Sequence, residues 1–144
     1  MNPELKSLYR DTLMGHSRDP KNRGVLENPD TTFELKNPLC GDVITIYLKA
    51  FQKQISQASF EAQCCSICMA SASMLTEKVA GTEIEQGISF ADSLIEMLVN
   101  PELELELHDA EEIQSLAGVK AFPSRIRCAT LPWEAFKEAV SQLK

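Results

Sequence analysis

The sequence lacks any uncharged apolar run that approaches the roughly 20 residues needed to cross a lipid bilayer. Residues 1–11 also lack the apolar core of a secretory signal peptide. We therefore expect a cytoplasmic protein with no membrane partner, in which reduced thiols are the default. Basic residues are scarce, since 14 Lys and Arg stand against 21 Asp and Glu and give a net charge of −7. Because phosphate-backbone binding needs a basic surface, nucleic acid is not an expected partner.

Lys and Arg are absent altogether from residues 79–119, a stretch that carries ten acidic residues. A solvated acidic face accounts for such a stretch, and a docking surface for a basic partner is the alternative. Internal repeats, linkers and low-complexity segments are absent as well. With 144 residues, the chain predicts a single domain over residues 1–144 with a core that needs no covalent staples.

Side-chain patterns predict an α+β fold with a three-stranded antiparallel sheet packed by helices on one face. Alternation predicts strands over 32–36, 43–51 and 55–62, and the link between the last two, 52–53, has no Gly or Asn to define its turn. The residues 102–107 also alternate, which fits either a strand or a loop. Helices are predicted from residue 3 up to Gly15, over 66–80, from a capping box at 82–85, over 89–99, over 109–117, and from 123 or 130 to 144, with Pro132 near the start of the last.

The cysteine count is odd, so five thiols cannot all pair, and disulfides are not expected in this compartment. Cys40 lies in a predicted tight turn, while Cys65 and Cys128 lie at predicted helix starts. Such element ends can bring distant side chains together, and Asp42 could add an oxygen. Three thiolates and one carboxylate would form a closed tetrahedral zinc site. Spacing alone leaves this open, because free cysteine is also a common small core residue.

The remaining two cysteines have other predicted roles. Cys65 and Cys68 form a CxxC, but no second CxxC completes a zinc knuckle and no βαβ pattern supports a redox pair. Cys68 is therefore predicted to be a core residue. Cys64 follows a strand, so its side chain should point away from that of Cys65 and act as a bystander or reserve thiol.

Other polar candidates are weaker. His16 and His108 are predicted to be surface residues without a site role. Arg125 and Arg127 flank Cys128, where they could offset the formal charge of −2 of zinc held by three thiolates and a carboxylate. The alternative is that both are solvent-exposed helix charges.

Four segments carry a family resemblance, namely LYR (8–10), NPLCGD (37–42), CSICMASASM (65–74) and FPSRIRCATL (122–131). With these motifs in order along nearly the whole chain, the sequence resembles the U-type iron–sulfur cluster assembly proteins, SufU and IscU. The resemblance implies the same α+β fold. It favours the SufU branch, because Arg127 stands where scaffold-type members have His, and an insertion in that branch would explain the long stretch from 81 to 128.

The resemblance further implies a zinc site made by Cys40, Asp42, Cys65 and Cys128. Cys40 would accept persulfide sulfur from a SufS-like cysteine desulfurase, with Arg125 orienting the persulfide, and sulfur would pass to a downstream iron–sulfur scaffold or apoprotein. Whether such a sulfur acceptor is itself an enzyme stays open. One alternative is a scaffold that assembles a [2Fe–2S] cluster on the same ligands, and another is a structural zinc module.

The sequence departs from the family pattern at two positions. Members usually have Gly at the position of Cys64 and a small residue other than cysteine at the position of Cys68. The extra thiols leave it open whether either can also hold sulfur.

Overall fold

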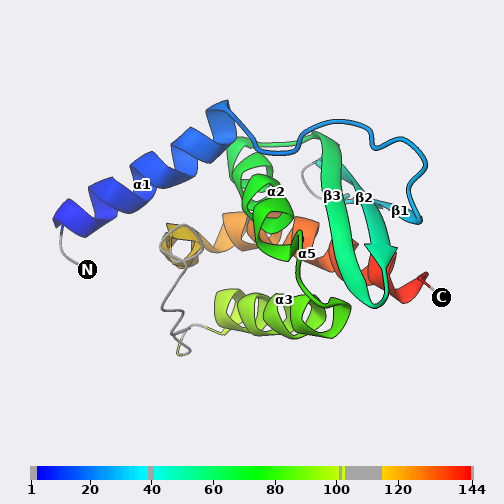
Figure 1. Cartoon of the computed structure of the whole chain (residues 1–144). Coiled ribbons are helices and arrows are strands. Elements are labelled where there is room, and N and C mark those ends of the chain that lie inside the picture. Colours follow the sequence, from blue (N-terminus) through cyan, green and yellow to red (C-terminus); the bar gives the residue numbers. More distant parts are fainter. Residues whose placement is uncertain (1–2, 39–40, 101, 103–114, 144) are drawn as a thin grey trace.

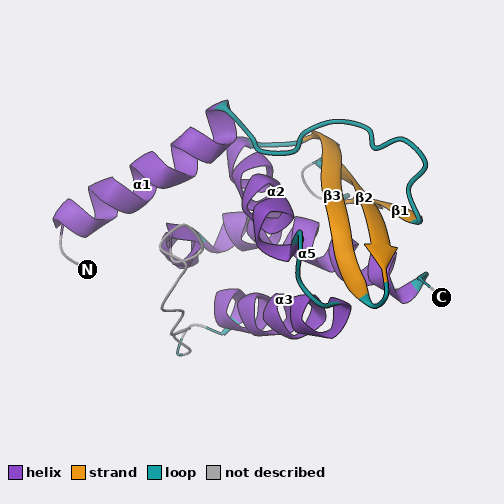
Figure 2. Cartoon of the chain, in the orientation of Figure 1, coloured by secondary structure: helices purple, strands orange, loops and turns teal. Residues whose placement is uncertain are grey.

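The computed structural model describes residues 3–38, 41–100, 102 and 115–143 of the chain. Helices and strands are grouped along the chain: one helix comes first, the three strands follow it, and the remaining helices come after the strands (Figure 1, Figure 2). In chain order the elements are α1 (Pro3–Arg18), β1 (Thr31–Lys36), β2 (Val43–Phe51), β3 (Gln54–Gln63), α2 (Ser66–Val79), α3 (Ile84–Val99), the 3₁₀ turns η1 (Ala117–Ala121) and η2 (Pro123–Arg125), and α5 (Ile126–Ser141).

The three strands form one antiparallel sheet in the order β1-β2-β3, as the alternation predicts. Strand β2 alternates between buried residues on one face and half-buried residues on the other. The buried residues are Ile44, Ile46 and Leu48, and they face the core. A period of two on an antiparallel strand puts one face toward the helices, so the α+β expectation is confirmed.

The turn between β2 and β3 is tight although it contains neither Gly nor Asn. Gln52 and Lys53 have φ angles of 51° and 67°, so both adopt the left-handed conformation that a two-residue type I′ hairpin requires. A register shift between Lys49 and Ala50 accompanies the turn. The hairpin geometry, rather than the local propensity of these residues, sets their backbone angles.

The helices pack on one face of the sheet and on each other. α5 contacts β1 and β2, and α2 contacts β3, while α3 packs against α5 and begins beside the turn between β2 and β3 (Figure 1). Trp133 and Phe136 of α5 are fully buried at the centre of these contacts. Large aromatic side chains bury the most apolar area, so α5 is the hub of the core.

Helix α1 extends beyond the predicted end. It continues through Gly15 to Arg18, so the prediction that Gly15 ends the helix is wrong. His16 is consequently helical and only 7% exposed, and its Nδ1 lies 2.7 Å from Oγ of Ser73 in α2. The expected surface histidine is instead a buried link between two helices.

Helix α3 is continuous from Ile84 to Val99, whereas the sequence predicts two shorter helices. The predicted capping box does not form, because Oγ1 of Thr82 donates to the carbonyl of Val79 and the N-cap, Glu83, makes no side-chain cap hydrogen bond. Gly87 sits inside this helix, where a Cβ would lie 3.0 Å from Cζ of Phe136. The glycine permits close helix packing instead of breaking the helix.

The final helix begins at Ile126, between the two predicted starts, and Pro132 lies inside it. The 3₁₀ turn Pro123–Arg125 leads directly into the helix. Proline has no N–H, so Pro132 cannot donate the usual helical hydrogen bond to the carbonyl of Cys128. Pro132 is nevertheless buried, which shows that tertiary packing outweighs the lost hydrogen bond.

Several expectations lie outside the described residues: residues 103–107 of the possible strand, most of the helix over 109–117, and the surface position of His108. In the described residues, no helix is both long and apolar enough to cross a bilayer.

Candidate metal centre

Asp42, Cys65 and Cys128 meet at one end of the sheet. One oxygen or sulfur atom from each lies within 4.8 Å of the others. The pairing of Val43 with Gln63 brings the start of β2 to the end of β3, and α2 begins three residues after Gln63. α5 packs against α2 and supplies Cys128. The fold thus brings together three of the four predicted ligands from separate elements.

Asp42 is buried, with an exposure of 5%. Its Oδ1 accepts a hydrogen bond of 3.2 Å from the backbone N–H of Cys65. Its Oδ2 is buried and has no hydrogen-bond partner within the described part of the chain. A buried carboxylate oxygen without a partner is costly, and a bound cation would remove that cost. The donor set of one carboxylate and two thiols fits Zn²⁺ in its chemistry.

The two thiols of this group lie at helix starts. Cys65 is the N-cap of α2 and makes no side-chain cap hydrogen bond, so its thiol is not committed to the helix. It is half-buried, and its carbonyl accepts the first helical hydrogen bond from Met69. Cys128 is the third residue of α5 and is 3% exposed. Both thiols therefore lie at the start of a helix, where backbone N–H groups are left without helical partners.

Cys40, the fourth predicted ligand, lies outside the described residues, so its place in the site stays a prediction. The flanking backbone forms a closed turn. The N–H of Asn37 donates to the carbonyl of Asp42, and the N–H of Gly41 donates to the carbonyl of Asn37. Gly41 has a φ of 76°, a left-handed value that glycine adopts without a steric penalty.

Cys64 and Cys68 are described, but neither belongs to the three-residue group. Cys68 is fully buried, as predicted for a core residue. A hydrogen bond with the Cys64 side chain raises the pKa of the Cys68 thiol, and burial and the nearby negative groups raise it further. Cys64 is half-buried and packs against the core. Cys64 therefore lies beside Cys68 and outside the three-residue group.

The two arginines differ in their surroundings. Nη1 of Arg127 forms a 2.7 Å ion pair with Glu134, about two turns further along α5, which matches the alternative of a solvent-exposed helix charge. Arg125 is exposed at the N-cap of α5, and the described part of the chain contains no ion pair to it. Arg125 is therefore the better placed of the two to meet an anionic group near Cys128.

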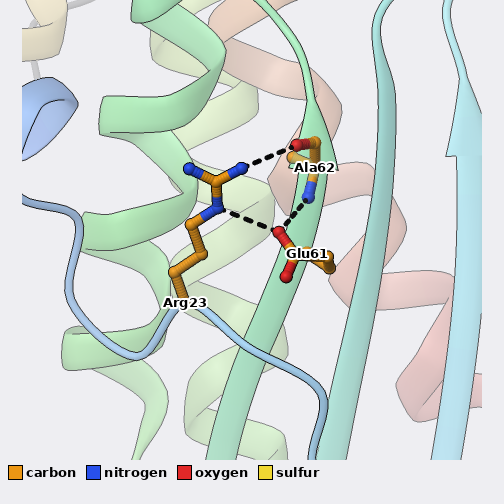
Figure 3. Close-up of polar contacts among 3 residues, drawn as sticks. All are labelled: Arg23, Glu61 and Ala62. Atoms are coloured by element: carbon orange, nitrogen blue, oxygen red, sulfur yellow. Dashed lines mark hydrogen bonds and ion pairs between the residues drawn. The ribbon is translucent and has the colours of Figure 1, made fainter.

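A contact that the sequence does not predict joins the loop after α1 to β3 (Figure 3). Arg23, from the loop after α1, donates through Nε to Glu61 at 2.9 Å and through Nη2 to the carbonyl of Ala62 at 3.3 Å. The hydrogen bond from Arg23 lowers the pKa of Glu61. The polar residue types of the loop between α1 and β1 do not reveal which strand the loop contacts.

Comparison with known proteins defines the class of this fold and site. The model of the NifU-like N-terminal domain family matches residues 8–129, and the chain belongs to that family. The resemblance drawn from the cysteine motifs is therefore confirmed.

Individual relatives span nearly the whole chain. The zinc-dependent sulfurtransferase SufU of Bacillus subtilis (strain 168) is 39% identical over 98% of this chain and 95% of its own length. The iron–sulfur cluster assembly scaffold protein IscU of Streptococcus pyogenes serotype M1 is 38% identical over 96% of this chain and 86% of its own.

Solved structures agree with the fold. A candidate SUF-system scaffold protein from Fervidobacterium islandicum AW-1 has a TM-score of 0.83 and 27% identity, covering 90% of this chain and 94% of that one. The N-terminal part of a NifU-like protein from Brucella abortus has a TM-score of 0.85 at 21% identity, covering 96% of each chain, and supports the fold alone.

Proposed function

We propose that this protein is a zinc-dependent sulfur-relay protein of iron–sulfur cluster biogenesis. The observation that carries the proposal is the convergence of Asp42, Cys65 and Cys128, with a buried Asp42 oxygen that lacks a partner. Zinc in this site would be held by these three residues together with Cys40, which lies two residues before Asp42 in the same turn. The similarity to a zinc-dependent sulfurtransferase over 98% of the chain supports the same assignment.

The chemistry that bound zinc supplies is to keep its ligand thiols deprotonated at neutral pH. Cys40 is the sulfur acceptor in this proposal. Its thiolate attacks the outer sulfur of a persulfide on a cysteine desulfurase, the new S–S bond forms on Cys40, and the desulfurase thiolate leaves. The left-handed backbone of the adjacent Gly41 gives the turn the freedom to present Cys40.

Arg125 has the supporting role. Its exposed guanidinium at the start of α5 can contact the anionic persulfide and hold it near the site. The partners in this proposal are a SufS-like cysteine desulfurase and a downstream iron–sulfur scaffold or apoprotein. The cytoplasm is the proposed compartment, since the reaction needs reduced thiols.

The leading alternative is a scaffold that assembles a [2Fe–2S] cluster on the same residues, and the relative from Streptococcus pyogenes is named as an iron–sulfur cluster assembly scaffold protein. The identity of residue 127, an arginine, argues against the scaffold role. This residue stands where the family resemblance places a histidine in scaffold-type members, and an always-charged guanidinium is not a metal ligand. Its ion pair with Glu134 gives it a surface role instead.

Metal analysis combined with a desulfurase assay tests the proposal. Protein purified without oxygen should contain about one zinc per chain, and adding it to a SufS-like desulfurase should raise the rate of sulfide production from cysteine. Iron with visible thiolate-to-iron absorption as the main species would favour the scaffold. Zinc without any stimulation would favour a structural zinc module.

A further inference from the structure

Two buried serines of α2 use their hydroxyl groups to bind different parts of the fold. Ser71 and Ser73 are both 0% exposed. Oγ of Ser73 accepts from the backbone N–H of Lys21 and lies 2.7 Å from Nδ1 of His16, so it ties α2 to α1 and to the loop that follows α1. Oγ of Ser71 instead bonds α5, the helix that supplies Cys128. The two serines are therefore a matched pair with different partners.

The hydroxyl of Ser71 both donates and accepts a hydrogen bond. Its O–H donates to the carbonyl of Ala129 at 2.6 Å, and its oxygen accepts from Nε1 of Trp133 at 3.0 Å. A serine inside a helix often donates to a carbonyl of its own preceding turn. Ser71 donates across to α5 instead, so its hydroxyl joins two helices.

This link lies close to the start of both helices, where the two thiols of the three-residue group lie. On α5, Ala129 directly follows Cys128. On α2, Ser71 lies six residues after Cys65, which corresponds to about 9 Å along the helix axis. The first turn of α5 also has one internal hydrogen bond fewer than usual, because Pro132 has no N–H. The bond from Ser71 thus holds α5 from outside at the part that its own hydrogen bonds hold least.

We propose that Ser71 is a positioning residue of the metal site. Its hydroxyl fixes the start of α5 against α2 and so keeps the thiol of Cys128 close enough to Cys65 and Asp42 for all three to bind one ion. Ser71 is not a ligand in this proposal, and it acts only through the helix that carries Cys128. The inference rests on the metal-binding part of the proposed function and does not need the sulfur relay.

Trp133 makes this coupling observable. It is the single tryptophan of the chain, and it is fully buried with its indole N–H bonded to Ser71. Metal binding at Cys128 would restrain the first turn of α5, and that restraint would reach the indole through Ala129 and Ser71. Both the indole N–H resonance and the fluorescence of Trp133 should therefore change when the metal-free chain takes up zinc.

The main test compares Ser71→Ala with Ser73→Ala in the full-length chain. Each protein is freed of metal under reducing, oxygen-free conditions and then titrated with Zn²⁺ in competition with a chelator. Ser71→Ala should bind zinc about tenfold more weakly than the wild type, whereas Ser73→Ala should stay within about twofold of it. Unchanged affinity in Ser71→Ala overturns the proposal. Equal losses in both variants also overturn it, because they would show that the loss of any buried hydroxyl from α2 weakens the site.

A spectroscopic measurement separates positioning from a general loss of stability. Co²⁺ takes the place of zinc, and its visible absorption depends on its coordination geometry. At saturating Co²⁺, the spectrum of Ser71→Ala should be weaker or shifted, and that of Ser73→Ala should match the wild type. Thermal melting of the metal-free proteins gives the stability of each variant. A wild-type cobalt spectrum in Ser71→Ala overturns the proposal.

The wild type alone decides the question if Ser71→Ala does not fold. The indole N–H resonance of Trp133 is then recorded before and after zinc is added, with the bound metal measured in both samples. A resonance that moves on zinc binding supports the coupling of the site to Ser71. A resonance that stays in place although zinc is bound overturns it.

Failure of this inference is distinguishable from failure of the proposed function. The affinity and cobalt measurements need no desulfurase, so a zinc-loaded wild type that does not stimulate a desulfurase overturns the relay alone. A wild type that binds zinc and stimulates, with Ser71→Ala indistinguishable from it, overturns the positioning role alone. A wild type that binds neither zinc nor cobalt overturns the metal site and the positioning role together.

Discussion

The two carboxylate oxygens of Asp42 have different surroundings in the folded chain. Oδ1 accepts from the backbone N–H of Cys65 and so fixes the start of β2 against the start of α2. Oδ2 is buried without a partner. One oxygen therefore positions the carboxylate, and the other is left for a cation. An anionic oxygen is also a harder ligand than a thiolate, so Asp42 should be the most labile member of the zinc site.

Replacing Asp42 with Ala should weaken zinc binding by about tenfold or more and reduce sulfur acceptance, because water takes the place of an anionic ligand. Chelator competition measures the affinity, and desulfurase stimulation measures acceptance. Asp19→Ala is the matched control, since its side chain is 90% exposed. If Asp42→Ala instead holds a stable [2Fe–2S] cluster after reconstitution and still stimulates fully, the protein is a scaffold and the relay proposal is wrong.

Cysteine substitutions assign the sulfur acceptor. Cys40→Ser should abolish desulfurase stimulation, because serine cannot carry a persulfide. Cys64→Ser and Cys68→Ala should stimulate normally, because neither side chain belongs to the ligand group. The rate of sulfide production with the cognate desulfurase is the measurement. Loss of stimulation in Cys68→Ala, with Cys40→Ser still active, would move the acceptor role away from Cys40.

At the scale of helices and strands, a glycine inside a helix has opposite consequences in α1 and α3. Gly15 has nothing within 4 Å of the position that a Cβ would occupy, whereas at Gly87 that Cβ would lie 3.0 Å from Cζ of Phe136. Phe136 is fully buried and has little room to move. Gly87 has a low helix propensity, but the close packing of α3 on α5 that it permits offsets this cost.

Gly87→Ala should destabilise the protein by about 1–3 kcal/mol, because overpacking a full core costs more than helix propensity gains. Gly15→Ala should stabilise it by about 0.5–1 kcal/mol, because only propensity changes there. Urea denaturation of both variants and the wild type measures the difference. A gain in stability from Gly87→Ala would show that α3 and α5 can separate at little cost.

The β2–β3 hairpin offers a second test at this scale. Gln52 and Lys53 hold left-handed angles that cost non-glycine residues about 1–2 kcal/mol each. The double variant Gln52→Asn/Lys53→Gly matches a type I′ turn and should stabilise the fold by about 1 kcal/mol, after the added freedom of glycine in the unfolded chain is subtracted. The thermal midpoint is the measurement, and Gln57→Asn at an exposed position of β3 is the control. A lower midpoint than wild type would contradict the type I′ assignment.

Local patterns predicted the strands well and the helix ends less well, for physical reasons. The alternation over 43–51 matches β2 because side-chain period alone decides which strand face is buried. The stop predicted at Gly15 failed because glycine does not by itself end a helix, and α1 continues to His16, which contacts Ser73 of α2. The break predicted before residue 89 failed because Gly87 lets α3 pack closely on α5. Packing against Phe136 is not visible in a local window.

The candidate site was predictable from motifs but not from spacing. Residue types and spacing alone did not decide whether the cysteines bind zinc or fill the core. The family resemblance supplied the predicted ligand set. The structure confirms that Asp42, Cys65 and Cys128 lie together. The contacts that the sequence missed, such as His16 with Ser73, join segments 57 residues apart and depend on the folded arrangement.

At the scale of the whole molecule, the metal site joins the main parts of the fold. Asp42 directly precedes the central strand β2, Cys65 lies at the start of α2, and Cys128 lies at the start of α5. α5 also carries two of the three largest fully buried side chains, Trp133 and Phe136. A metal held at this junction links the sheet to the two helices that cover it, so metal binding and folding should be coupled.

Removing the metal should therefore lower the stability of the whole protein. A ligand present at 100 times its dissociation constant adds about 2.7 kcal/mol, which for a domain of this size corresponds to a shift of about 5–10 °C in the thermal midpoint. Scanning calorimetry of the isolated protein before and after exhaustive treatment with a strong chelator, with metal content checked in both samples, measures the shift. Returning one equivalent of zinc should restore the midpoint, and the same chelator should shift Asp42→Ala less because that variant binds zinc more weakly from the start. An unchanged midpoint after confirmed metal loss would mean that the core around α5 is sufficient by itself, and that the site serves sulfur chemistry without holding the fold together.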